Sequence, residues 1–282
     1  MVFKDVLLSL TTYPDPTPVS ALEDPIAFAA AIGARISAVA CEVKYRVPGS
    51  VFGNMLLNIP AIATTEFKKS AANAEELLSA FQSAAERKGV FGERITEQCL
   101  TSDTADVLVE HARLRDLTIV PVPDGDHLDQ WYAQSIIFGS GRPTLVMPHA
   151  PKRTGALTLD TVAVAWDFSR PAARAVADAL PILEKAKQVH IVTVTHEKNI
   201  SSRRSADELA KNLLSHNVQV TLDTVDAGGR GIGETLTSYV DSVNADILVM
   251  GAYGHSRLRD FILGGATKSM VSKPAVPIFL SH

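Results

Sequence analysis

Hydrophobic and polar positions follow a regular succession of strand and helix patterns along the chain. The first half begins with the apolar run DVLLSL (residues 5–10), and an Ala-rich stretch with helical spacing follows at residues 20–34. β-Branched runs and charged amphipathic stretches then alternate up to the apolar run DLTIVPV (residues 116–122). Strands that alternate with helices predict a parallel sheet with right-handed crossovers and helices on both faces.

The second half repeats this order of elements. It begins with TVAVAW (residues 161–166), and its fourth strand pattern is DILVMGA (residues 246–252). Each half ends with a glycine-containing segment, a proline and a last apolar run. This repeat predicts two tandem, doubly wound, flavodoxin-like α/β domains with five-stranded, mainly parallel sheets. We place them at residues 1–149 and 158–282, because the seam between them is rich in proline, glycine and charge.

Serines precede two of the expected helices, and one segment stands outside the repeat. Ser20 and Ser169 are candidate N-caps, because a serine hydroxyl accepts a hydrogen bond from a free N–H of the first helical turn. The segment 44–64 has no counterpart of equal length in the second half. Its apolar residues suggest either a lid or a packing flap, and the sequence does not decide between them.

Composition and charge narrow the range of functions. The chain has 282 residues, 46% of them hydrophobic and 21% charged, as in an ordinary globular protein. A net charge of -4 gives no general basic field, so nucleic acid is not an expected partner. No run approaches the about 20 apolar residues of a membrane helix, and a signal-peptide pattern is missing. We therefore expect a soluble, cytoplasmic protein without a membrane partner, in which Cys41 and Cys99 are buried free thiols.

The most distinctive segment is the glycine-rich stretch after the apolar run ADILVM. Gly251, Gly254, Gly264 and Gly265 bracket a polar, partly basic segment at the carboxyl end of a strand, where ligands bind in parallel sheets. Glycine permits a close approach of backbone N–H groups to a ligand. A helix start is expected at residues 266–271, and its free N–H groups and dipole would attract phosphate. The pattern therefore predicts an anion site with two sides.

Side chains in the same stretch would add contacts to a bound phosphate. Ser256 and Thr267 carry hydroxyl groups, and Arg257 carries a guanidinium group. His255 would contact phosphate when protonated, although an exposed loop histidine is the commoner case. The stretch matches neither the Walker pattern nor G-x-G-x-x-G. The segment GGRGIGE (residues 228–234) comes near the latter, but a flexible strand-to-helix turn explains it better.

The spacing of these glycines, G-x2-G-x9-G, resembles the ATP-binding loop of universal stress proteins, and VAVAWDFS (residues 162–169) resembles the first strand of that family. The resemblance extends over the chain as a tandem pair. It implies that Asp167 lies near the adenosine and that Ala165 lies at the strand end on the adenine side. It also implies a phosphate-binding set, with the strand end and first loop positions at Met250, Gly251 and Gly254 and the phosphate-binding amides at Gly264, Gly265 and Ala266.

Two positions depart from the family pattern. Gly265 stands where the family has Ser or Thr, so a hydroxyl that would contact phosphate is missing. Phe168 replaces the Gly after Asp167 and adds bulk near the nucleoside. Backbone N–H donors survive both changes, so the resemblance still implies ATP as the ligand, with Mg²⁺ as a companion ion.

The first half lacks this loop. After LTIVPV it has the single glycine Gly125, and Asp124, Asp126 and Asp129 would place negative charge where a phosphate would lie. With His127, these aspartates are interpreted as a solvated acidic turn that caps the next helix, in preference to a divalent metal site, because the glycine and distal glutamate of a calcium loop are missing. No aspartate follows its first strand at the corresponding place. We predict that the first domain does not bind ATP and is a structural partner or holds a different ligand. The segment FGSGR (residues 138–142) is interpreted as a remnant of the lost loop.

The sequence thus predicts an adenine-nucleotide-binding protein with a stress-response or regulatory role and one competent site, in the second half. No nucleophile, general base or metal-ligand set is convincingly placed, so we expect no enzyme beyond slow ATP hydrolysis. The two halves would pair through their last strands as an intrachain pseudo-dimer, and chains could associate further into a homodimer.

Two alternatives stay open. The protein could be a nucleotide-independent regulatory or interaction protein, whose glycine segments serve only as turns. It could also be a small-molecule hydrolase or transferase that uses the segment 44–64 as a lid, with Asp167 or His255 as its acid or base.

Overall fold

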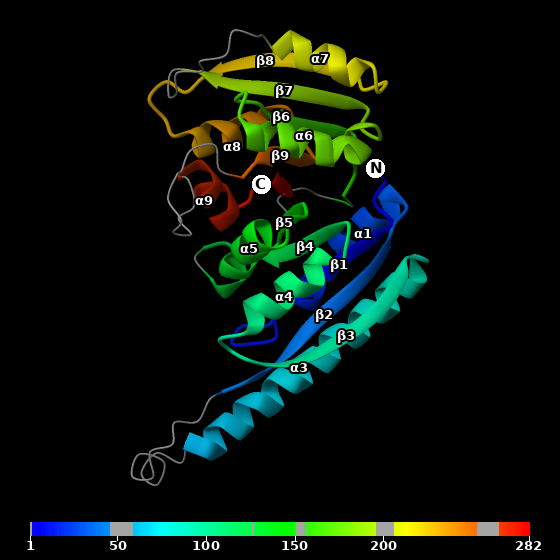
Figure 1. The fold of residues 1–282 in the computed structure, drawn as a ribbon, viewed down its shortest axis with the longest axis vertical. Helices are drawn as coiled ribbons and strands as arrows, with labels where there is room; N and C mark the ends of the chain where they lie inside the picture. Colours follow the sequence, from blue (N-terminus) through cyan, green and yellow to red (C-terminus); the bar gives the residue numbers. More distant parts are fainter. Residues whose placement is uncertain are drawn as a thin grey trace.

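A single twisted sheet with helices on both faces forms the molecule (Figure 1). The computed structural model describes residues 2–45, 59–125, 127–150, 155, 157–195, 206–252 and 265–282. The strands within these ranges are β1 (Asp5–Leu10), β2 (Arg35–Lys44), β3 (Phe91–Leu100), β4 (Leu117–Val122), β5 (Thr144–Pro148), β6 (Thr161–Ala165), β7 (Gln188–Thr195), β8 (Val220–Asp226), β9 (Ile247–Gly251) and β10 (Ile278–Ser281). The helices are α1 (Glu23–Ile32), α3 (Ile59–Arg87), α4 (Thr104–Arg113), α5 (Leu128–Gly139), α6 (Arg170–Leu183), α7 (Ala206–Leu214), α8 (Ile232–Ser242) and α9 (Gly265–Ser272).

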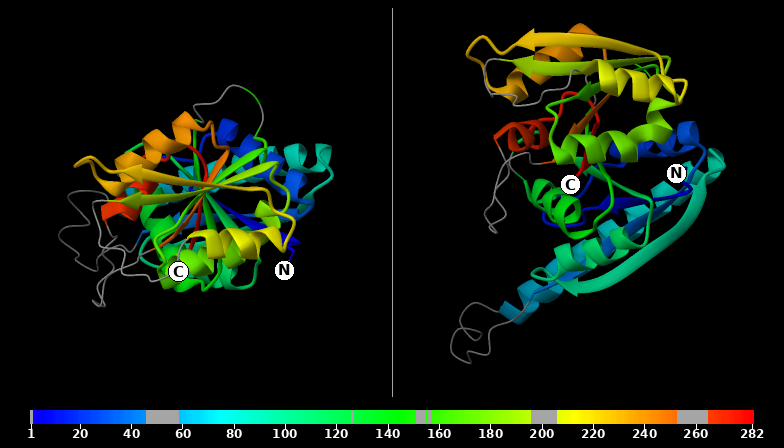
Figure 2. Two further views of the ribbon diagram at one scale, coloured as in Figure 1. Left: turned by 90° about the horizontal axis from the view of Figure 1, so that it is seen from above. Right: turned by 45° about the horizontal axis from the view of Figure 1, so that its top comes forward.

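The strand order shows the internal repeat directly. It runs β3-β2-β1-β4-β5-β10-β9-β6-β7-β8, so each half contributes five neighbouring strands in the same relative order. Neighbouring strands are parallel within each half, whereas β5 and β10 pair antiparallel, with Val146 opposite Ile278. The predicted pairing of the last strands is therefore confirmed, and it joins the two five-stranded sheets into one. Figure 2 shows the strong twist of this sheet, whose strands fan out when viewed from above.

Apolar side chains fill a layer on each face of the sheet. One layer contains Ile26 of α1 and Leu78 of α3 from the first half, with Val176 of α6 from the second. The opposite layer contains Leu108 of α4 and Val240 of α8, and helices α5 and α9 pack into it as well. Both faces of the strands are thus covered, which explains why their sequences are almost continuously apolar.

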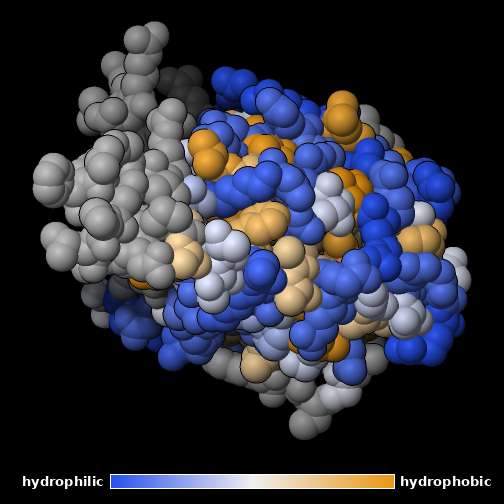
Figure 3. Space-filling view, turned by 90° about the horizontal axis from the view of Figure 1, so that it is seen from below, coloured by the Kyte–Doolittle hydropathy of each residue, from blue (hydrophilic) through white to orange (hydrophobic). Residues whose placement is uncertain are grey.

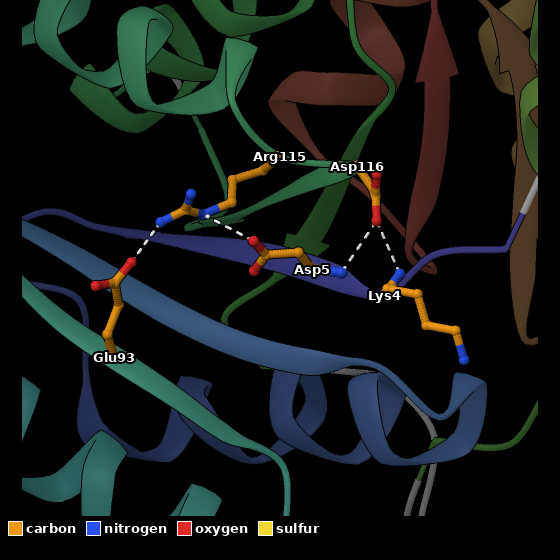
Figure 4. A network of polar contacts seen from close by, with 5 residues as sticks. All are labelled: Lys4, Asp5, Glu93, Arg115 and Asp116. Carbon is orange, nitrogen blue, oxygen red and sulfur yellow. Dashed lines mark hydrogen bonds and ion pairs between the residues drawn. The ribbon is translucent and has the colours of Figure 1, made fainter.

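An aspartate ties the start of the sheet together in the same way in each half. Asp116, just before β4, accepts hydrogen bonds from the backbone N–H groups of Lys4 and Asp5 at 2.8 and 3.0 Å (Figure 4). Asp246, just before β9, accepts them from Asp160 and Thr161 at 2.8 and 2.9 Å. Both aspartates satisfy N–H groups at the start of the neighbouring strand, so the repeat extends to individual polar contacts.

An arginine reinforces this corner in the first half through ion pairs. The side chain of Arg115 reaches Glu93 at 2.5 Å and Asp5 at 3.6 Å, and it is 15% exposed. Figure 4 shows the arginine lying between the two carboxylates, which come from β3 and β1. The pair therefore links the edge strand β3 to the centre of the first half.

The two predicted serine N-caps have different outcomes. Ser169 caps α6 as predicted, because its hydroxyl accepts the N–H of Ala172 at 3.2 Å. The prediction for Ser20 is wrong, since this residue lies within a 3₁₀ turn, Val19–Leu22, that leads straight into α1. Leu22 occupies the N-cap position of α1 and makes no side-chain cap.

The segment 44–64 is only partly a separate insertion. Residues 46–58 lie outside the described residues, and Ile59–Thr64 form the first turns of α3, which is 29 residues long. Figures 1 and 2 show these turns extending beyond the end of β2, away from the second half of the chain. Ile62 is 56% exposed there. The described part of the segment is therefore a helical extension and does not cover the second half as a lid would.

The part of the surface seen in Figure 3 is mainly hydrophilic, and both cysteines are buried. Figure 3 shows the end of the molecule that the first half forms, where hydrophilic residues predominate and hydrophobic ones lie between them in small groups. Cys41 and Cys99 are buried and free, as predicted. Among the described helices, none combines the length and the apolar character needed to cross a bilayer.

Candidate functional site

The strand order reverses at β6 and β9, which in doubly wound sheets marks the place of a ligand crevice at the carboxyl ends of these strands. The chain runs from β6 outward to β7 and β8 and then returns to β9 on the other side of β6. Connections that leave these two strands therefore diverge in opposite directions, which opens a crevice where ligands bind in doubly wound sheets. The pairs Val162–Ile247 and Val164–Val249 set the register, so both strands end side by side.

Ala165 and Asp167 lie on the β6 side of this crevice. Ala165 is the last residue of β6 and is half-buried. An oxygen of Asp167, Oδ1, accepts the backbone N–H of Ser169 at 3.0 Å, and Ser169 in turn caps α6. Helix α6 therefore begins at the crevice, and the partial positive charge of its N-terminus faces the same region as the end of β6.

Phe168 adopts a backbone conformation that favours glycine. Its φ is +61°, in the left-handed region, where most residues cost roughly 1 kcal/mol or more. Its ring packs against Trp166 with the ring centroids 5.5 Å apart. This contact offsets part of the backbone cost, so the turn keeps its shape although the glycine of the family pattern is replaced. Phe168 thus adds an aromatic ring directly beside Asp167.

Met250 and Gly251 lie on the β9 side. Met250 is 6% exposed, and Gly251 is the last residue of β9, paired with Ser281 of β10. A Cβ atom on Gly251 would lie 2.5 Å from the backbone nitrogen of Ala172, in the first turn of α6. Gly251 therefore has a packing role that sequence reasoning missed, because α6 approaches the end of β9 more closely than any side chain allows. Its predicted role at a phosphate is a separate matter and stays a prediction.

Helix α9 begins at Gly265, which confirms the predicted helix start. Gly265 is exposed, Ala266 follows it within the helix, and the side chain of Thr267 is 3% exposed. The other predicted site residues lie outside the described residues: Gly254, His255, Ser256, Arg257 and Gly264. The structure thus brings together Ala165, Asp167, Met250 and Gly251 at the two strand ends, and it supplies a second helix N-terminus after them in the chain.

The segment GGRGIGE forms the connection between β8 and α8, as the turn interpretation predicts. Gly228 and Gly229 have φ values of +59° and +81°, which require glycine or a strained residue. Asp226 accepts the N–H of Gly228 at 2.9 Å, and Gly231 is the N-cap of α8. Local geometry therefore explains these glycines without a ligand.

In the first half, polar groups near the corresponding ends of β1 and β4 form hydrogen bonds with one another. The Thr11 hydroxyl donates to Asp129 Oδ1 at 2.5 Å, and the Thr11 N–H donates to the hydroxyl of Thr17 at 3.0 Å. The Thr12 hydroxyl lies 2.8 Å from that of Ser70 in α3. Polar groups that a ligand would use are already paired, which supports the prediction that this half does not bind ATP.

Two interpretations of this half are wrong. Asp129 is not part of a solvated acidic turn: it is 5% exposed, and burial raises the pKa of its carboxyl group, partly countered by the Thr11 hydroxyl. Asp126 lies outside the described residues. The segment FGSGR is not a remnant of the phosphate loop, because it ends α5 and leads into β5 at the opposite, amino end of the strands.

Comparisons with known proteins place these observations in a family. Residues 158–282 match the sequence model of the universal stress protein family. No curated protein sequence matches the chain. Among solved structures, a universal stress protein from Archaeoglobus fulgidus is 16% identical, with a TM-score of 0.71, and the alignment covers 98% of this chain and 95% of the other. A Pseudomonas aeruginosa protein assigned to the same family is 14% identical, with a TM-score of 0.56 over 99% and 93% of the two chains.

At these identities, the structural matches establish the fold alone, and the match to the family's sequence model is confined to the second half. Both structural alignments include the first half, which the family model does not match. Residues 158–282 thus match the universal stress protein family, and the fold of a solved universal stress protein extends along the whole chain, in which it is present twice.

Proposed function

We propose that the second half binds an adenine nucleotide, ATP, at the carboxyl ends of β6 and β9, and that the protein uses this binding in a cytoplasmic stress-response or regulatory role. The observation that carries the proposal is the reversal of the strand order between β6 and β9. Asp167 lies just after β6, and Gly251 ends the adjacent strand β9. Both residues lie within the part of the chain that matches the universal stress protein family.

Backbone groups would supply most of the binding energy. The first N–H groups of α9 have no acceptor within the helix, and its partial positive charge also favours a phosphate. The N-terminus of α6 adds a partial positive charge, although Ser169 already accepts the N–H of Ala172 and Pro171 has none. Asp167 is held by the Ser169 N–H, so its carboxylate is fixed at the end of β6, where it could accept hydrogen bonds from a ribose or base. Mg²⁺ would then arrive with the phosphates, because the residues described contain no group of three or more His, Cys, Asp or Glu side chains that could hold a metal.

One observation favours the nucleotide-independent alternative. Gly251 is required for packing against α6, and Gly228 and Gly229 are required for a turn. Some of the glycines that suggest a phosphate site therefore have structural reasons of their own. If every glycine of the pattern had such a structural reason, the glycines would be no evidence for a nucleotide. The protein would then be an interaction or regulatory protein that binds none.

A binding measurement separates these two functions. We expect calorimetric titration of the full chain with ATP to show binding, and Gly254→Val to weaken it at least about tenfold, or roughly 1.4 kcal/mol. Gly155→Val, in the seam between the halves, is the control and should bind like the wild-type chain. Mass spectrometry of gently purified protein should also reveal a co-purified adenine nucleotide. Absence of binding by the wild-type chain would support the nucleotide-independent function.

A further inference from the structure

Helix α9 is held at its C-terminal end by the first half of the chain. The carbonyl oxygen of Ser272 accepts a hydrogen bond from the N–H of Gly125, at 2.9 Å. Gly125 belongs to the turn between β4 and α5. The last carbonyl groups of a helix have no partner within the helix, so this bond satisfies a group that would otherwise need water. Lys273 and Asp124 add an ion pair at 3.8 Å, which is exposed and contributes little energy.

The turn that makes this contact is itself fixed. Gly125 has a φ of +108°, which residues with a side chain rarely adopt. The buried side chain of Gln130 accepts the N–H of His127 at 2.7 Å and donates to the carbonyl of Pro123 at 2.8 Å. These bonds connect Gln130 to residues on either side of the turn. They lie next to Gly125, whose N–H contacts α9.

A second contact from α5 reaches the end of β9. Ala252 donates its N–H to the carbonyl of Ser281 at 2.8 Å, and its own carbonyl lies 3.1 Å from Nδ1 of His282. A carbonyl can only accept, so Nδ1 of His282 carries the proton in this contact. Phe138, near the end of α5, packs edge-on against the His282 ring, with centroids 5.2 Å apart. The first half thus supports the imidazole that holds Ala252.

We propose that the first half is a positioning element for the nucleotide site of the second half. Its helix α5 and the preceding turn hold Ala252, at the end of β9, and α9, which are the two elements on which that site is built. This inference rests on the proposed nucleotide binding. It gives the first half, whose polar groups near the ends of β1 and β4 are already paired, a defined function: its contacts keep the binding groups of the second half in place, so that less ordering is needed when the ligand binds.

The test combines two variants with a matched control, all in the full chain. Gly125→Ala introduces a Cβ at a φ of +108°, so the turn must shift and its hydrogen bond to Ser272 should break. Phe138→Leu removes the ring that packs on His282 and keeps an apolar side chain. Gly33→Ala is the control, because it places a similar strain at φ +73° at the C-cap of α1, outside these contacts.

Two measurements keep this inference separate from the proposed function. Hydrogen exchange of the nucleotide-free chain should be faster in α9 for Gly125→Ala and at the end of β9 for Phe138→Leu, but unchanged there for Gly33→Ala. Calorimetry should show that the two variants bind ATP about two- to tenfold more weakly than the wild-type chain. The melting temperatures of both variants should be no lower than that of Gly33→Ala.

Each outcome has a definite meaning. Faster exchange in α9 together with absent ATP binding in the wild-type chain would refute the proposed function and leave the positioning contacts established. Unchanged exchange in both variants would overturn the inference. So would an equal loss of affinity in Gly33→Ala, because general destabilisation would then explain the effect.

Discussion

At Gly251, a methyl group would lie 2.5 Å from the backbone nitrogen of Ala172, so packing alone excludes a side chain. The close approach also brings the first turn of α6 to the end of β9, where a phosphate would meet the positive end of the helix dipole. Packing against α6 and the proposed phosphate binding therefore both require glycine at position 251. A glycine in a loop motif is evidence for a ligand only after its contacts with the rest of the protein have been examined.

Asp129 offers a test of residue-level energetics. It is buried and accepts a hydrogen bond from Thr11, and burial raises the pKa of its carboxyl group. A raised pKa in the folded state means that this group favours folding at low pH, below its unfolded pKa of about 3.9, and that this contribution is lost as pH rises through the folded value. Asn at this position keeps an acceptor for Thr11 and removes the charge.

We expect Asp129→Asn to raise the melting temperature at pH 8 by about 2 °C, with the difference from the wild-type chain shrinking toward pH 4. Thermal unfolding followed by circular dichroism across this range measures it. Asp15→Asn, at an exposed position, should leave the melting temperature unchanged. A lower melting temperature for Asp129→Asn at pH 8 would show that the carboxylate is favourable in its buried site.

At the scale of elements, a polar network ties the edge of the second half together. Asp223 of β8 accepts hydrogen bonds from the Tyr239 hydroxyl of α8 at 2.5 Å and from His190 Nδ1 of β7 at 3.0 Å. Burial alone would raise the pKa of the Asp223 carboxyl group, but the bonds from Tyr239 and His190 outweigh it and lower the pKa. The carboxylate thus connects a helix and two strands.

A lowered pKa means that Asp223 stabilises the fold above its unfolded pKa of about 3.9 and loses this effect as pH falls through the folded value. We expect Asp223→Asn to reduce the free energy of unfolding by about 1 kcal/mol at pH 7, a modest loss because the side chain is 34% exposed. Urea denaturation at pH 7 and pH 3 measures this, and the difference should shrink at the lower pH. Tyr239→Phe, which removes one donor, should cost less. Equal stability of Asp223→Asn and the wild-type chain at pH 7 would contradict the network's role.

The sequence predicts elements better than contacts between them. Strand and helix patterns are set by burial on both faces of the sheet, which repeats along the chain and is visible in its apolar positions. The start of α9 at Gly265 and the cap at Ser169 were predicted because their signals are local. Ser20 failed, since a 3₁₀ turn continues into α1 there. The burial of Asp129 and the bond from Gly125 to Ser272 depend on residues far away in the chain, and no local pattern carries them.

At the scale of the whole molecule, the antiparallel pairing of β5 with β10 turns two repeats into one ten-stranded sheet. Each half would otherwise present the edge of its last strand to solvent. Leu145 of β5 and Phe279 of β10 lie opposite each other and are both fully buried in the same core layer. The β5–β10 pairing therefore shares an apolar core as well as a ladder of backbone bonds, and it sets the relative position that the contact from Gly125 to α9 and the contact from Phe138 to His282 need.

Separating the two halves tests whether β10 needs the pairing with β5. In a fragment of residues 157–282, strand β10 would expose its backbone N–H and C=O groups together with apolar side chains that β5 and its neighbours cover in the full chain. We expect the fragment to associate through this edge into a dimer, because a second copy of β10 offers the same antiparallel pairing that β5 provides. Analytical ultracentrifugation over a dilution series measures the association, with the full chain as the control whose edge is already paired. A folded fragment that stays monomeric at all concentrations would show that β10 needs no partner strand. The β5–β10 pairing would then form only because the two halves are joined in one chain, and it would not itself drive their association.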